Sequence, residues 1–152
     1  MIRIERATPE NTEFVAQHLR PGDKMELAHN GRVDFVAAVR ESVRVSPFAF
    51  CALLDGEPVC VFGLKPDGVI SKRACVWLLG TPTLNTIKKG FAKTCRMVLT
   101  GLWDIYPELY NAVDANYPQA IRLLQFLGAE FGQTVKSETG HPFILFELRR
   151  KK

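Results

Sequence analysis

Four cysteines and three histidines are the residues of this 152-residue chain best suited to nucleophilic or metal chemistry. The cysteines, Cys51, Cys60, Cys75 and Cys95, form no C-x-x-C pair, and no histidine follows them at zinc-finger spacing. Three of them stand inside apolar runs, where a free thiol behaves as a small hydrophobe. We therefore predict core cysteines, with a zinc site or a catalytic thiol as the alternative.

The histidines are scattered. His18 falls in a predicted helix, His29 in a predicted loop and His141 in a predicted turn. No shared face brings them together, so we expect surface or structural roles for them rather than catalysis.

Length and composition favour one folded domain over residues 1–152. Apolar residues make up 47% of the chain, which argues against disorder. No apolar run approaches the ~20 residues of a membrane helix, and the N-terminus lacks the apolar segment of a signal peptide. We expect a soluble protein made in the cytosol.

The first half of the chain predicts one strand, two helices and a hairpin. Residues 2–6 alternate apolar and charged side chains, as a half-buried strand does. Thr8 and Pro9 open a helix that Pro21-Gly22-Asp23 ends, and a second helix covers residues 33–43. Two apolar runs within residues 48–64 flank Asp55-Gly56, a dipeptide that favours a tight hairpin turn.

The second half predicts a strand–helix–strand–helix unit and two closing strands. Its elements are a strand over 74–79, a long helix over 85–105, a strand over 109–115, a helix over 118–127, and strands near 130–136 and 143–149. The order is β-α-α-β-β-β-α-β-α-β-β. The long helix implies a right-handed crossover between parallel strands. We predict an α/β (α+β) fold with a mixed sheet and helices on both faces.

This order of elements, and the stretch from Trp77 to Gly128 in particular, resembles the GNAT superfamily of N-acetyltransferases. The segment Ala120-Ile121-Arg122-Leu123-Leu124-Gln125-Phe126-Leu127-Gly128-Ala129 is similar to the family's A-x-x-L-Y-x-x-x-G-F motif. The resemblance implies a centrally splayed sheet with acyl-CoA between its fourth and fifth strands. It also implies a pyrophosphate held by the N–H groups that open the next helix.

The resemblance places acetyl-CoA, if it binds, against Leu78, Leu79, Thr81, Lys88, Lys89 and Asn116. The nearest match to the family's phosphate loop, Gln/Arg-x-x-Gly-x-Gly/Ala, is Ile87-x-x-Gly90-x-Ala92. It lacks the leading polar residue and falls inside the predicted helix. Pro82 would remove one N–H from the cradle, and Lys88 and Lys89 would supply charge in compensation.

The family's catalytic residues are only partly matched. Leu124 stands where many members carry the tyrosine that protonates the leaving thiolate. Tyr117 is the substitute acid that the resemblance allows, against the alternative of a surface-anchoring aromatic at a helix start. Asp114 is the best-placed base, against the alternative of a turn residue before the next helix. Glu26 and His29 fall in the loop that covers substrate in the family.

A narrower resemblance fits these absences. The stretches 77–82, 109–116, 121–129 and 140–148 look like a GNAT-like family of internal virion and virion-assembly proteins from short-tailed phages. That resemblance implies phage structural proteins as partners, with a homo-oligomer left open, and a place in the host cytoplasm during infection or in the virion. Acetyl-CoA is not required for that role.

The basic residues of the chain leave two interpretations. Part of the net charge of +4 lies in residues 149–152, which read either as a solvated tail or as a contact for nucleic acid, CoA phosphates or an acidic partner. No aromatic side chains alternate with the basic ones, which argues against nucleic-acid binding. The sequence thus favours a virion-assembly protein without efficient catalysis, with an acetyl-CoA-dependent N-acetyltransferase acting by direct transfer as the alternative.

Overall fold

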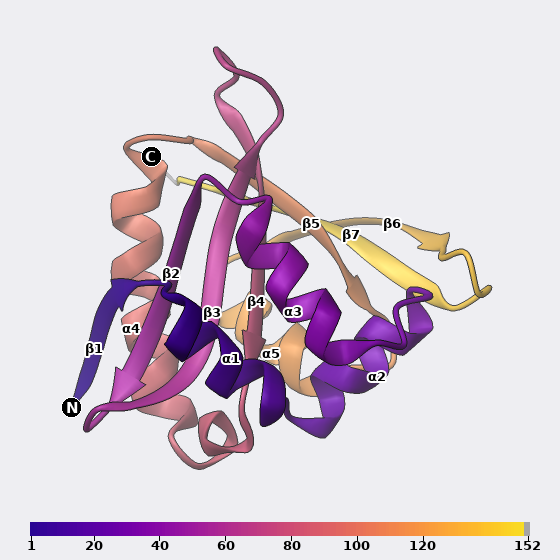
Figure 1. Cartoon of the computed structure of the whole chain (residues 1–152). Coiled ribbons are helices and arrows are strands. Elements are labelled where there is room, and N and C mark those ends of the chain that lie inside the picture. Colours follow the sequence, from indigo (N-terminus) through magenta and orange to yellow (C-terminus); the bar gives the residue numbers. More distant parts are fainter. Residues whose placement is uncertain (151–152) are drawn as a thin grey trace.

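The computed structural model, which describes residues 1–150, is built on one seven-stranded sheet (Figure 1). The strands lie in the order β1-β2-β3-β4-β5-β7-β6. Their bounds are β1 Ile2–Arg6, β2 Phe48–Leu54, β3 Glu57–Pro66, β4 Arg73–Gly80, β5 Glu108–Asp114, β6 Glu130–Lys136 and β7 Pro142–Arg149. All seven predicted strands are present, with ends close to those predicted.

Two halves of the sheet meet at β4 and β5, the one parallel pair. The pairing covers only three residue pairs, from Arg73 opposite Glu108 to Cys75 opposite Tyr110. Beyond Cys75 the two strands diverge. The predicted parallel crossover and mixed sheet are therefore confirmed, and the splay lies at the join between the halves.

Turn chemistry explains the hairpin of β2 and β3. Asp55 has φ = 50° and Gly56 has φ = 87°, the backbone region that Asp-Gly tolerates. Gly128 likewise has φ = 86° where α5 ends, which is the geometry of a glycine helix terminus.

The N-terminal segment contains three helices where two are predicted. They are α1 Pro9–Gln17, α2 Pro21–His29 and α3 Phe35–Arg44. The prediction that Pro21-Gly22-Asp23 only ends a helix is wrong, since these residues open α2. Proline suits the first turn of a helix as well as it suits a break, and Asp23 adds the negative charge that a helix start favours. Glu26 and His29 therefore lie on a helix and not in a loop.

The long helix also begins later than predicted. A short 3₁₀ helix, η1, covers Pro82–Thr86, and α4 runs from Lys88 to Trp103. Pro82 thus precedes the helix start and takes no N–H from its first turn. The last helix, α5, covers Pro118–Phe126, as predicted to within one residue.

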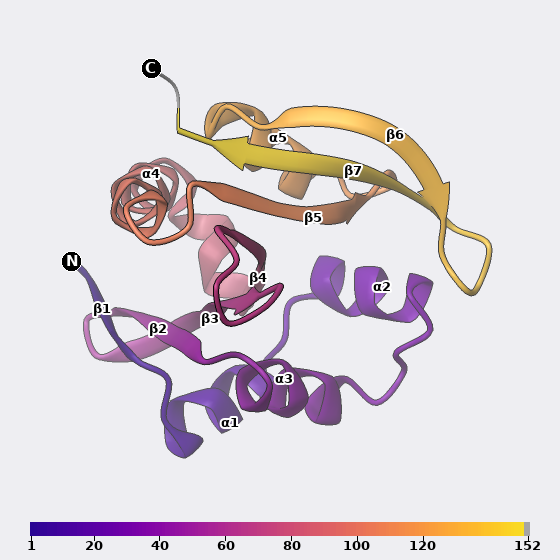
Figure 2. The same ribbon diagram turned by 90° about the horizontal axis from the view of Figure 1, so that it is seen from above.

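Helices cover both faces of the sheet (Figure 2). On one face α1 and α3 pack through Val15, Ala16 and Val39 against β2, β3 and β4. On the other face α4 and α5 pack against residues such as Leu64, Leu109 and Phe146. The predicted class, a mixed sheet with helices on both faces, is confirmed.

The two arginines of the predicted basic tail that the structure describes are held by acidic partners. Arg149 pairs with Glu147, and Arg150 pairs with Asp104 and donates to the carbonyl oxygen of Thr100 at 2.8 Å. Residues 151–152 lie outside the described residues. No helix of residues 1–150 is both long and apolar enough to cross a membrane.

The tight contact at Gly63 makes a stability prediction. A Cβ at Gly63 would lie 2.6 Å from the carbonyl oxygen of Phe48 and 2.9 Å from the ring of Trp77. We expect Gly63→Ala to lower the free energy of unfolding by ~1–3 kcal/mol, because backbone cannot move aside cheaply. Gly101→Ala on α4 is the control: nothing lies within 4 Å of the added Cβ, and helix propensity should raise stability by up to ~1 kcal/mol. Urea unfolding measures both, and equal effects would contradict the packing argument.

Candidate functional site

One cavity of about 750 Å³ passes between the diverging parts of β4 and β5. Its lining includes Leu78, which packs on the α4 face of the sheet, and Leu79, which packs on the α1 face. It therefore contacts both faces of the sheet. Its volume lies in the range of ligand pockets, and most of its lining is apolar.

The edge of β4 offers unpaired backbone to this cavity. On the side away from β3, the carbonyl oxygen of Val76 accepts from the Asn111 amide at 2.7 Å, and Gly80 bonds residues of the α1–α2 junction. Peptide groups alternate sides along a strand, so the N–H and C=O of Leu78 also point into the gap, where β5 offers no strand partner. An amide-containing ligand can take the place of that partner.

A buried carboxylate, Asp23, holds one side of the cavity together. It is 2% exposed and accepts three hydrogen bonds: from Arg20 Nε at 3.0 Å, from the Gly80 N–H at 2.7 Å and from the Tyr117 hydroxyl at 2.7 Å. Arg20 is itself buried and also donates to Asn85 Oδ1 at 3.3 Å. The cluster joins the α1–α2 junction, the end of β4 and the start of α5.

Tyr117 lines the cavity, but its hydroxyl proton points at Asp23. The side chain is only 4% exposed, so it is not a surface-anchoring aromatic. Its ring occupies the space beside Gly22, where a Cβ would lie 2.5 Å from it. Burial and the negative charge of Asp23 raise the pKa of Tyr117 well above the usual range, because both oppose the phenolate. A hydroxyl group with such a raised pKa is a weak acid.

Glu26 is the titratable carboxylate that faces the cavity. It lies on α2 and accepts the backbone N–H of Asp114 through Oε2 at 2.9 Å. Burial, reinforced by the nearby charges of Asp23 and Asp114, raises the pKa of Glu26 to about 7 and outweighs that hydrogen bond. A carboxylate that titrates near neutral pH is suited to act as a general base.

Asp114 serves the local structure. It is fully buried, accepts the N–H of Asn116 at 2.9 Å and bonds His29 Nδ1 at 2.5 Å. The His29 ring stacks on His141 with 3.8 Å between centroids, which joins α2 to the β6–β7 turn. The alternative of a turn residue therefore matches the geometry of Asp114, while its role as a base stays a prediction.

The start of α4 has the features of an anion site. No side chain caps its N-terminus, and its first turn contains no acidic residue. Lys88, Lys89 and Gly90 supply the first N–H groups, so the Ile87-x-x-Gly90-x-Ala92 match lies at the helix start and not inside it. Gly90 borders open space, since a Cβ added there would have no neighbour within 4 Å.

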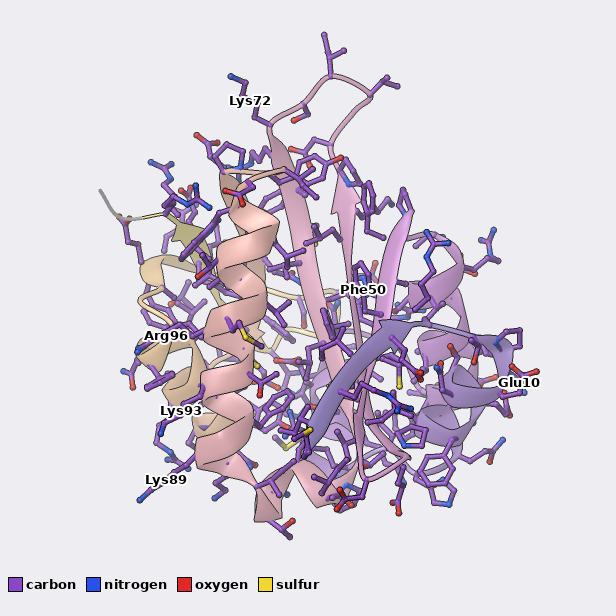
Figure 3. The ribbon with its side chains drawn as sticks, turned by 90° about the vertical axis from the view of Figure 1, so that its left-hand side faces the viewer. Glu10, Phe50, Lys72, Lys89, Lys93 and Arg96 are labelled. Carbon is purple, nitrogen blue, oxygen red and sulfur yellow. The ribbon has the colours of Figure 1, made fainter. Side chains whose placement is uncertain are left out.

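Further cations surround that end of the cavity. Lys93 on α4 and Arg122 on α5 line it together with Lys88 and Lys89, and all four are exposed. Figure 3 shows Lys89 and Lys93 projecting from α4. Within residues 1–150 none of the four is paired with a carboxylate. Phosphate groups would supply the missing negative charge.

The structure brings together five of the predicted site residues and leaves three outside the lining. Leu78, Leu79, Lys88, Lys89 and Tyr117 line the cavity. Thr81, Asp114 and Asn116 do not. The roles of all eight in binding or catalysis stay predictions.

The cysteines are poor nucleophiles. Cys51 and Cys60 are buried as predicted, and Cys75 and Cys95 are half-buried. Burial raises the pKa of all four thiols, to about 12 for Cys51 and Cys95. Across residues 1–150 no group of three histidine, cysteine or acidic side chains is placed to hold a metal ion.

Sequence reasoning missed Arg20 and Asp23, and it placed Glu26 in a substrate-covering loop without assigning it a catalytic role. The sequence pattern puts Arg20 and Asp23 at a helix end, whereas the main partners of Asp23 are Gly80 and Tyr117, 57 and 94 residues away. One local signal could have found Asp23, since an acidic residue two positions after a proline suits a helix start.

Solved structures resemble this chain over nearly its whole length, although no family model and no curated protein sequence matches it. AAC(6')-Ib in complex with ribostamycin and coenzyme A matches with a TM-score of 0.71 and 18% identity, over 98% of this chain and 93% of that one. The GNAT-family acetyltransferase from Streptococcus pneumoniae matches with a TM-score of 0.67 and 11% identity, over 99% and 100%.

A spermidine N-acetyltransferase chimera, from Vibrio cholerae SpeG and hSSAT, matches with a TM-score of 0.69 and 14% identity, over 96% of this chain and 93% of that one. At sequence identities of 11–18%, these matches show a shared fold and nothing further. That architecture, with its mixed seven-stranded sheet divided between β4 and β5, is the GNAT fold.

Proposed function

We propose that this chain transfers an acetyl group from acetyl-CoA to the amine of a small acceptor. The cavity between β4 and β5 is the observation that supports the proposal. Its lining includes the cations Lys88 and Lys89 and also Glu26, a carboxylate whose pKa is about 7. Structural neighbours with the same fold are in complex with coenzyme A or acetyl-CoA, which supports this choice of donor.

The residues present fit such a donor. The backbone N–H and C=O of Leu78 can form hydrogen bonds with the amides of a pantetheine arm. The apolar walls of the cavity can hold the methylene groups of that arm. Lys88, Lys89 and the first N–H groups of α4 can hold a pyrophosphate. When bound, the donor supplies a thioester whose C–S bond breaks as the new C–N bond forms.

Glu26 is the residue we assign to the acceptor's proton. In its ionised form it takes a proton from the acceptor ammonium, directly or through one water, and leaves a neutral amine that can attack the carbonyl carbon. The amine loses a second proton as the amide forms, and the departing sulfur ends as a thiol. Net, one acetyl group moves to nitrogen and one proton is released.

Tyr117 positions the cavity wall in this proposal. Its proton is held by Asp23, and a phenolate beside that carboxylate would be unfavourable. The assignment of Tyr117 as the acid therefore has less support from the geometry than a positioning role does.

The virion-assembly role stays a prediction. No observation on the described residues favours it over catalysis, and the cavity with its unpaired cations is what an acyl-CoA enzyme would need. Phage partners, oligomeric state and location in the host or virion likewise remain predictions.

Removing the cations at the start of α4 should weaken donor binding. We expect the Lys88→Ala and Lys89→Ala variants each to raise the Kd for acetyl-CoA about 5- to 10-fold, which is ~1 kcal/mol, with a smaller effect at high salt. Titration calorimetry measures the Kd. Lys72→Ala is the control, since Lys72 lies between β3 and β4 at the end of the molecule opposite the start of α4 (Figure 3). No binding of acetyl-CoA at millimolar concentration would overturn the proposed function.

The base should be visible in the pH dependence of the reaction. A carboxylate with a raised pKa is protonated and inactive below that pKa, so kcat/KM should rise with pH to about pH 7 and then level off on account of Glu26. Glu26→Gln should abolish this rise and lower kcat by ~10²–10⁴-fold, leaving the Kd for acetyl-CoA unchanged. The exposed carboxylate variant Glu10→Gln is the control. A pH rise that survives in Glu26→Gln would assign the base elsewhere.

Tyr117→Phe separates positioning from acid catalysis. Loss of one of three hydrogen bonds to buried Asp23 should lower the free energy of unfolding by ~1–3 kcal/mol, while kcat changes only a few-fold. Thermal unfolding and steady-state kinetics on the same preparation measure the two effects. If the turnover rate instead drops by ~10²-fold or more at unchanged stability, Tyr117 is restored as the acid.

A further inference from the structure

The cavity lining contains a further charged side chain, Arg32, to which the proposed transfer assigns no role. Arg32, in the loop after α2, lines the same cavity as Glu26 and is only partly exposed. Its Nη2 donates to the carbonyl oxygen of Ala38 at 3.5 Å, the long limit of a hydrogen bond. Within residues 1–150 no carboxylate oxygen lies within 4.0 Å of its guanidinium.

Neighbouring acids do not neutralise Arg32. Glu41 on α3 lies close enough for the charge of Arg32 to act on it, but Arg44 holds both oxygens of Glu41, with Nε at 2.8 Å. The guanidinium fork thus retains donors free for a ligand. Arginine in a partly buried site is well suited to a carboxylate or a phosphate, which it can bind with two parallel hydrogen bonds.

The negative charge of the cavity lining is limited to one free carboxylate. Asp23 also lines the cavity, but Arg20 neutralises it. Glu26, the other carboxylate of the lining, forms no ion pair within residues 1–150, although the charge of Arg20 acts on it. A polyamine would need several free carboxylates, so this lining is poorly suited to a polycation.

We infer that the acceptor is a small amine that also carries an anionic group, a carboxylate or a phosphate, with Glu26 at the amine and Arg32 at the anion. This inference rests on the proposed acetyl transfer. The lining of the same cavity also includes Leu27, Trp77 and Phe143, which offer apolar surface to the rest of the acceptor. Amino acids with apolar side chains have this combination of groups.

Paired acceptors test the inference directly. L-leucine and 3-methylbutylamine differ only in the carboxylate, O-phosphoethanolamine and ethanolamine differ only in the phosphate, and spermidine is a polycation without either group. We expect kcat/KM for at least one anionic member to exceed that of its partner by about 10- to 100-fold. The pair that shows the difference identifies the anion. Equal values within both pairs, or spermidine as the best acceptor, would overturn the inference.

Arg32→Gln adds the test of the residue. It should remove the advantage of the acceptor that carries the anionic group and leave the Kd for acetyl-CoA unchanged. Arg3→Gln is the matched control, because Arg3 is exposed on β1 and does not line the cavity. If the preference survives in Arg32→Gln, the assignment of Arg32 is wrong.

The outcomes separate the inference from the function on which it rests. If acetyl-CoA does not bind, both fail. If acetyl-CoA binds and amines without an anionic group are acetylated as fast as those that carry one, only the inference fails. The comparison of acceptors uses the unmodified protein, so it does not depend on the folding of any variant.

Discussion

The geometry of the cavity depends on one buried charge, the carboxylate of Asp23. A carboxylate that is 2% exposed is costly unless every oxygen is satisfied, and here Arg20, the Gly80 N–H and the Tyr117 hydroxyl satisfy it. These three donors come from segments far apart in the sequence. Because removing any one leaves buried charge underbonded, the α1–α2 junction, the end of β4 and the start of α5 are held in one arrangement.

Because Asp23 fixes the end of β4, strands β4 and β5 can separate beyond Cys75 while the rest of the sheet keeps its pairing. A parallel pair that stops at Cys75 leaves backbone groups of β4 without strand partners, which is normally unfavourable inside a protein. The chain meets most of this need with side chains: Asn111 bonds the carbonyl oxygen of Val76, and Asp23 bonds the Gly80 N–H. The backbone N–H and C=O of Leu78 point into the cavity, where β5 offers no strand partner. Side chains thus satisfy the backbone of β4 at Val76 and at Gly80, and the backbone between them, at Leu78, is available to a ligand.

Local sequence patterns predicted the parts of this fold that local chemistry determines. Asp55-Gly56 defined its hairpin because few dipeptides tolerate positive φ at both positions, and Gly128 marked the end of α5 for a similar reason. The prediction that Pro21-Gly22-Asp23 ends a helix was wrong, since the same residues can also open the next helix. The start of α4 was predicted three residues too early, which hid the position of Gly90, the glycine of the nearest match to the family's phosphate loop, in the first turn of the helix. Asp23 and Arg32 are ordinary surface residue types in the sequence, and only tertiary contacts give them a buried or cavity-lining position.

For the proposed acetyl transfer, the absence of a tyrosine at Leu124 would matter less than the presence of Glu26. A thiol has a pKa of ~8.5, so a thiolate can leave without an acid and take its proton from water. An alkylammonium acceptor has a pKa of ~10.4 and cannot attack until it loses a proton. Passing that proton to a carboxylate at the ordinary 4.5 is uphill by ~6 pKa units, whereas passing it to Glu26 at about 7 is uphill by ~3. Burial of Glu26 therefore lowers the cost of forming the neutral amine by about 3 kcal/mol. In the proposed transfer, the burial that raises the pKa of Glu26 would remove the need for a stronger base, and the demanding step would be loss of the acceptor's proton and not departure of the sulfur.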